Sequence, residues 1–222
     1  MTEEEWLSIG DLRKHVEQVV AMKQLRKLRL FSVACCLQLE PWIGEPQLLE
    51  AINRAEKLAD GALSESTIEK WYQKVIRLQR DAVRKHGRQW TAQVAVFKYV
   101  RFVCLPSRYS EFSDCWWGLV RPIPLFGEEF TQRGPALAHQ LLVDIFGNPF
   151  RPVAFDPAWR TSATVGVAQQ MYDARDFAAM PILADALQDA GCETADILQH
   201  CRDEKQVHVR GCWVVDLVLN KS

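Results

Sequence analysis

The sequence has almost no net charge and no long uncharged apolar run. Its 27 basic and 28 acidic residues give a formal net charge of −1 over 222 residues, so no global field attracts nucleic acid or an anionic membrane. No apolar run approaches the roughly 18–20 uncharged residues that a membrane-spanning helix needs. We therefore predict no membrane span, and nucleic acid would require a local basic patch.

The sequence also lacks the short motifs of several enzyme classes. It contains no phosphate-binding loop, no G-x-G-x-x-G, no H-E-x-x-H and no paired-carboxylate signature. Residues 1–5 (MTEEE) are acidic, whereas a secretory signal begins basic and then turns apolar. These absences favour a cytoplasmic protein that is not an enzyme, and no residue is singled out as catalytic.

What the sequence does contain is a succession of amphipathic helical patterns. Apolar residues make up 48% of the chain and charged residues 25%, which is ordinary for a globular protein. Apolar residues recur at three- and four-residue steps in residues 23–39, 45–60, 64–86 and 135–146. Residues 90–105 fit either a buried helix or a strand, and the succession of helical patterns before them favours a helix.

Two segments interrupt the helical pattern. Residues 106–133 carry three prolines and several aromatic residues, which indicates an irregular insertion. Residues 147–159 (GNPFRPVAFDPAW) contain three more prolines, each of which fixes the backbone. We therefore predict an extended loop at 147–156, with Phe150, Phe155 and Trp159 buried.

Together these patterns predict an all-α protein with one multi-helix globular domain over residues 1–222. A C-terminal helical unit is expected at about 160–222, where Gly191 ends one helix and Thr194 begins the next. We expect residues 1–40 to pack against this unit.

The two ends of the chain carry long motifs. These are MTEEEWL, KLRLF and ACC near the N-terminus, followed by DIFGNPFRPVAFDPAW, PILADALQDAGC, ILQHCR and HVRGCWVVD. In these motifs the chain resembles a family of uncharacterised bacterial proteins, over residues 1–40 and about 142–222. The resemblance implies no activity, but it implies that the two ends act together.

A concentration of thiols and imidazoles near the C-terminus is a candidate metal site, formed by Cys192, His200, Cys201, His208 and Cys212. Zinc prefers these ligands, and His208 and Cys212 would share one face of a helix. Their spacing matches no recognised zinc motif, and His200 and Cys201 would project about 100° apart on a helix. The favoured alternative is buried core thiols with structural imidazoles. Cysteine catalysis is a third interpretation, but no recognised sequence signature surrounds these cysteines.

Two further groups are candidate binding residues. One helical segment contains a cluster of basic residues, Lys23, Arg26, Lys27 and Arg29. This cluster would neutralise the phosphates of a nucleic acid, or it is simply the solvated face of an amphipathic helix. Loops often carry function, so Asn148, Arg151 and Asp156 are candidates, although a structural brace is favoured for their loop.

We therefore predict a non-catalytic helical interaction or scaffold protein with an unknown protein partner and no cofactor. The alternative is a zinc-binding or thiol-dependent protein that uses the C-terminal cysteines and histidines. A further alternative is a nucleic-acid-binding module that uses the basic segment at 23–29.

Overall fold

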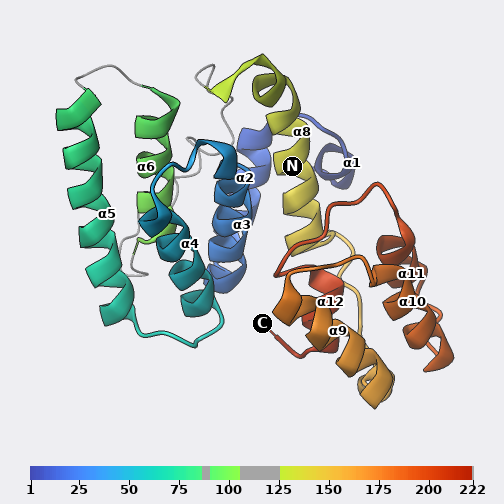
Figure 1. Ribbon diagram of the computed structural model, residues 1–222. Coiled ribbons are helices and arrows are strands. Elements are labelled where there is room, and N and C mark those ends of the chain that lie inside the picture. Colours follow the sequence, from blue (N-terminus) through green and yellow to red (C-terminus); the bar gives the residue numbers. More distant parts are fainter. Residues whose placement is uncertain (87–90, 106–125, 222) are drawn as a thin grey trace. The chain divides into compact units, whose positions relative to one another are not determined.

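The computed structural model describes residues 1–86, 91–105 and 126–221. Every regular element within these ranges is a helix (Figure 1), so the predicted all-α class is confirmed. Residues 90–105, for which helix and strand were both open, contain helix α6 (Ala92–Val103), which Thr91 caps. None of the helices in the described ranges is both long enough and apolar enough to cross a membrane.

The chain divides into two compact units. Unit 1 consists of Met1 and Ile9–His139, and unit 2 consists of Thr2–Ser8 and Gln140–Ser222. Of the residues 1–40 that were expected to pack against the C-terminal part, only Thr2–Ser8 belong to unit 2. Later residues of that segment, such as Val33 and Cys36, lie in the core of unit 1. That the whole chain forms one domain stays a prediction.

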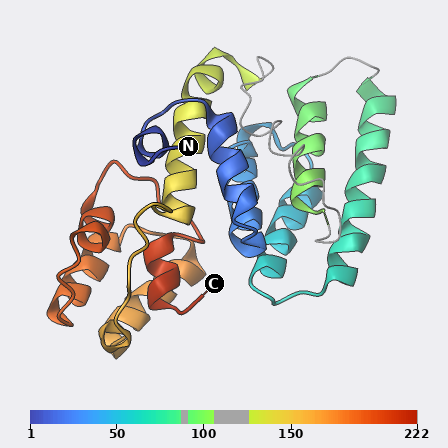
Figure 2. The same cartoon turned by 180° about the vertical axis from the view of Figure 1, so that it is seen from behind.

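Unit 1 is a bundle in which helices α3 to α6 pack against one another (Figures 1 and 2). Its core includes Ile52, Ile68 and Val96, which have no exposed surface. The elements of this unit are α2 (Leu12–Ala21), α3 (Leu25–Leu37), the 3-10 turn η1 (Glu40–Trp42), α4 (Pro46–Ala59), α5 (Glu65–His86), α6 and the first part of α8 (Glu128–Phe146).

Unit 2 contains the end of α8 and a set of short helices around a second core. These are α1 (Glu3–Leu7), the 3-10 turn η3 (Pro157–Trp159), α9 (Ser162–Ala174), α10 (Met180–Asp189), α11 (Ala195–Arg202) and α12 (Trp213–Val218). Helix α10 packs against α9 and α11, and α12 packs against α9 and α11 (Figure 1). Gly191 has a φ of +90° just after α10, as predicted. Thr194 precedes α11 as predicted, but its side chain makes no capping hydrogen bond.

Helix α8 begins earlier than the sequence predicted. Its first residue is Glu128, and Pro135 lies inside the helix instead of beginning it. The last part of the predicted irregular insertion, residues 128–133, is therefore helical. The rest of that insertion, residues 106–125, lies outside the described residues.

The proline-containing loop after α8 is non-helical until η3, but residues 149–151 form a turn and a bend where an extended loop was predicted. Its aromatic residues are also less buried than expected. Phe150 is 38% exposed, so its predicted burial is wrong. Its backbone N–H donates to the side-chain oxygen of Asn148 at 3.0 Å, which fixes a tight turn at the surface. Phe155 and Trp159 are half-buried against the core of unit 2, with their rings in edge contact at 5.3 Å.

The first helix is attached to this loop. Trp6 is completely buried, and its indole Nε1–H donates to the carbonyl oxygen of Gly147 at 3.0 Å. Thr2 and Glu5 form the capping box that begins α1. A helix of only five residues is too short to be stable alone, so this docking contact holds it in place.

Gly147 is a position in unit 2 where a side chain is poorly tolerated. Its φ is +64°, and an added Cβ would lie 3.2 Å from Cγ of Trp213. We expect Gly147→Ala to lower the free energy of unfolding by about 1–3 kcal/mol, because alanine is strained at positive φ and Trp213 would have to move. Urea denaturation measures this change.

Gly166→Ala is the matched control. Gly166 lies inside α9, and an added Cβ there meets no atom within 4 Å. This substitution should raise the free energy of unfolding by about 0.5–1 kcal/mol. Equal effects of the two substitutions would show that Gly147 is not a constrained position.

Candidate metal centre

A single acidic residue, Asp144, lies in the apolar face at the end of α8. The side chains of Leu141, Leu142 and Ile145 around it in the sequence are buried, and Asp144 itself has no exposed surface. An isolated buried carboxylate is strongly unfavourable unless other groups bind it. The structure provides those groups from the C-terminal forty residues.

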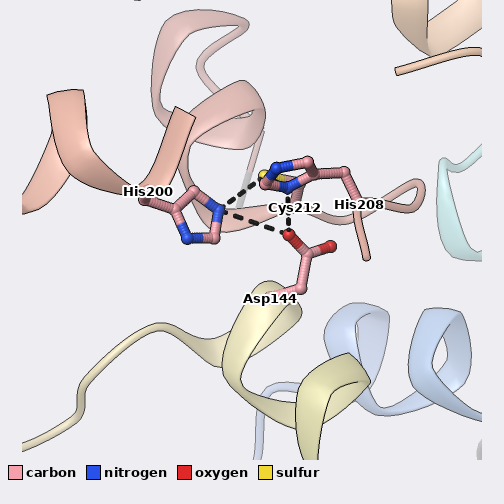
Figure 3. A group of neighbouring side chains, drawn as sticks. All are labelled: Asp144, His200, His208 and Cys212. Atoms are coloured by element: carbon pink, nitrogen blue, oxygen red, sulfur yellow. Dashed lines mark hydrogen bonds and ion pairs between the residues drawn. The ribbon is translucent and has the colours of Figure 1, made fainter. Parts of the chain in front are cut away.

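Three groups bind the Asp144 carboxylate (Figure 3). Its Oδ1 lies 2.8 Å from Nδ1 of His208 and 3.2 Å from Nε2 of His200. The backbone N–H of Val209 donates to Oδ2 at 3.0 Å. Burial raises the pKa of the carboxyl, but the hydrogen bonds from His200 and His208 outweigh burial, so the pKa lies below its ordinary value.

The sulfur of Cys212 completes the group. It lies 3.2 Å from Nε2 of His200 and 3.9 Å from Nδ1 of His208. Cys212 is completely buried, and burial together with the charge of Asp144 places the pKa of its thiol well above the ordinary value. Figure 3 shows the four side chains pointing toward a common centre, and one ligand atom of each lies within 4.8 Å of the others.

The tertiary fold brings these residues together from four separate places. Asp144 is on α8, His200 is on the last turns of α11, and His208 is in the non-helical segment that follows. Cys212 is the N-cap of α12, directly after Gly211, whose φ of +95° turns the chain. The predicted shared helix face of His208 and Cys212 is therefore wrong, although the two residues do meet.

The distances in this cluster are near those between the ligands of a tetrahedral metal ion. Two ligand atoms at 2.0–2.3 Å from one zinc ion are about 3.3–3.8 Å apart at the tetrahedral angle. Four of the six pairs of ligand atoms in the cluster are separated by 3.2, 3.2, 2.8 and 3.9 Å, and the other two pairs by no more than 4.8 Å. The shortest pair would have to move apart, and the more distant pairs together, for one ion to bind all four.

The pattern of contacts differs from that of a catalytic triad. In a triad, one imidazole nitrogen faces the nucleophile and the other faces the carboxylate. Here a single nitrogen, Nε2 of His200, lies at 3.2 Å from both Asp144 and Cys212. Ligands around a shared ion have this arrangement, and so does an imidazole whose N–H is shared between two acceptors. The sulfur is also completely buried, so a substrate has no access to it.

His208 faces the cluster with one of its two ring nitrogens. Its Nδ1 lies near Asp144 and Cys212, whereas its Nε2 is buried and has no hydrogen-bond partner among the described residues. An unpaired buried nitrogen is costly, and an ion bound to Nδ1 would leave Nε2 unpaired as well. The unpaired Nε2 therefore does not distinguish a metal site from a hydrogen-bonded cluster.

Three of the five residues of the predicted metal site, His200, His208 and Cys212, converge with Asp144, whereas Cys192 and Cys201 do not join the cluster. All three cysteines are buried in the core of unit 2, as the interpretation of buried core thiols expects. Burial raises the pKa of the Cys201 thiol to about 12.

Asp144 was missed by the sequence-based reasoning. The signal was present, because Asp144 is the only charged residue in the apolar stretch LLVDIF. Charged residues are almost never fully buried unless they are paired. An acidic residue on the inner face of an amphipathic helix is therefore a candidate ligand in its own right.

The other candidate residues have structural partners. Arg29 is buried and donates to the carbonyl oxygens of Val103 and Leu105, both at 2.9 Å. Arg26 pairs with Asp60 at 3.1 Å. Two of the four residues of the predicted basic patch, Arg26 and Arg29, are therefore engaged by groups of the protein itself.

The candidate residues of the proline loop also have local roles. Asn148 and Arg151 both bind Glu3 of helix α1, at 2.8 and 2.6 Å. The carboxylate of Asp156 accepts from the backbone N–H of Ala158 and begins η3. These contacts agree with the favoured interpretation of the loop as a brace.

No protein-family model, no curated protein and no solved structure matches this chain. The interpretation of the site therefore depends on its geometry and chemistry alone.

Proposed function

We propose that this chain is a non-catalytic helical protein whose unit 2 is held together by a structural zinc ion bound to Asp144, His200, His208 and Cys212. The observation that carries the proposal is the convergence of one carboxylate oxygen, two imidazole nitrogens and one thiol sulfur within 4.8 Å in a buried place.

The ligand set favours zinc over the common hard cations. Calcium and magnesium take oxygen ligands, whereas this site offers two nitrogens and a sulfur beside one carboxylate. Zinc accepts all three kinds of ligand in tetrahedral geometry. Catalytic zinc sites keep one position open for water or substrate. Four buried protein ligands leave no such position, which supports a structural role.

A zinc ion at this place would join segments that are otherwise connected by short, irregular turns. It would tie α8 to α11, to the segment around His208 and to the beginning of α12. Because binding to the folded state alone stabilises that state, the ion would fix the surface that unit 2 presents. An interaction or scaffold role for that surface stays a prediction.

The first test is metal content and its effect on stability. The purified full chain should contain about one zinc ion per molecule by elemental analysis, as four convergent ligands define one site. Removal of the ion with a chelator should lower the free energy of unfolding. Addition of zinc at a free concentration of 100 times the dissociation constant should raise the free energy of unfolding again by about 2.7 kcal/mol. Absence of zinc and of any zinc-dependent stabilisation would rule the proposal out.

The second test uses two buried cysteines of the same unit. Cys212→Ala removes a ligand and should weaken zinc binding by more than about 100-fold. Loss of a residue that only supports a ligand typically weakens metal binding by about 10- to 100-fold. Cys192→Ala is the matched control, because Cys192 is equally buried in the same core but does not belong to the cluster of four side chains. It should lower stability without changing zinc affinity. Chelator competition measures both affinities, and equal affinities would exclude Cys212 as a ligand.

A further inference from the structure

We infer that helix α1 belongs to the metal centre: Trp6 is a positioning residue that holds Asp144 and Cys212 in place through Gly147. This inference rests on the proposed zinc site, and it assigns to the first eight residues of the chain a role in metal affinity.

The first step is the docking of α1 on the end of α8. The buried indole of Trp6 donates to the carbonyl oxygen of Gly147 at 3.0 Å. Gly147 follows α8 directly, and its N–H donates to the carbonyl of Val143 at 2.9 Å. Trp6 therefore fixes the last turn of the helix, from which Asp144 extends.

Glu3 strengthens this docking. Its Oε1 accepts from Nδ2 of Asn148 at 2.8 Å and pairs with Nε of Arg151 at 2.6 Å. Helix α1 therefore binds the segment just after the Asp144 turn at three points.

The second step runs from Gly147 to the other ligands. The indole of Trp213 lies so close to Gly147 that an added Cβ would meet it at 3.2 Å. Trp213 follows Cys212 directly, and its ring also packs on the ring of His200, with centroids 5.1 Å apart. The contact between Gly147 and Trp213 thus sets the distance between the α8 ligand and the ligands of α11 and α12.

These two steps form one chain of contacts: Trp6, Gly147, Trp213 and His200. A substitution that weakens the contact between α1 and Gly147 lets the end of α8 shift relative to α12. Such a shift makes the distances between the ligand atoms more variable. Supporting residues of this kind typically change metal affinity by about 10- to 100-fold. Because such coupling is reciprocal, zinc in turn holds α1 against unit 2.

The test is the zinc affinity of Trp6→Phe in the full chain, measured by chelator competition. Phenylalanine keeps an aromatic ring but lacks the N–H that binds Gly147. We expect about 10-fold weaker zinc binding and a changed visible spectrum when Co²⁺ replaces zinc. Trp71→Phe is the control, because Trp71 packs against the core of unit 1. The zinc affinity of the Trp71→Phe variant should equal that of the wild type.

A merely structural role of Trp6 predicts a different result. The metal-free and zinc-bound forms of Trp6→Phe would then lose equal stability, with zinc affinity and the Co²⁺ spectrum unchanged, and the inference would be overturned. If the wild type itself binds no zinc, the proposed function fails first and this inference falls with it.

A milder pair of variants covers the case in which Trp6→Phe does not fold. Glu3→Gln removes the charge that binds Arg151, whereas Glu4→Gln makes the same charge change one residue later at an exposed position. We expect up to about fivefold weaker zinc binding for Glu3→Gln, the limit set by a partly exposed ion pair, and no change for Glu4→Gln. Equal affinities for the two variants would contradict the inference.

Discussion

The buried carboxylate of Asp144 is the constraint on which unit 2 depends. A charge at a position without exposed surface must be balanced, because its desolvation is far more costly than any single contact is favourable. Two imidazoles and a backbone N–H surround it, and each comes from the segment after α10. The end of the chain is therefore folded back onto α8 by one acidic side chain.

The short helices of unit 2 depend on tertiary contacts more than on helical propensity. Helix α1 has five residues and α12 has six, which is well below the length at which isolated helices are stable. Both are held next to Gly147, one through the indole of Trp6 and the other through the indole of Trp213. A glycine between two tryptophans is thus the junction at which the first and last helices of the chain meet the end of α8.

Unit 1 shows how a charge is buried without a metal. The guanidinium of Arg29 donates to two carbonyl oxygens at the C-terminal end of α6, where unpaired carbonyls and the helix dipole favour a cation. Burial lowers the pKa of this group, but the carbonyls satisfy its charge. Asp144, by contrast, is surrounded by two imidazoles and a thiol, which are side chains of the kinds that bind metal ions. That difference makes the surroundings of Asp144, and not those of Arg29, a candidate metal centre.

The sequence alone determined the helical class, because apolar spacing and capping residues act within a few positions along the chain. It also identified His200, His208 and Cys212, since their ligand chemistry is a property of the residue type. Only the tertiary structure decided that Asp144 joins them and that Cys192 and Cys201 do not. Which side chains converge depends on how α8, α11 and the turn at Gly211 pack, and such long-range contacts leave no periodic pattern in one sequence. For the same reason the burial of Phe150 was predicted wrongly: its side chain is apolar, but the residue lies in the turn fixed by Asn148, where it is exposed.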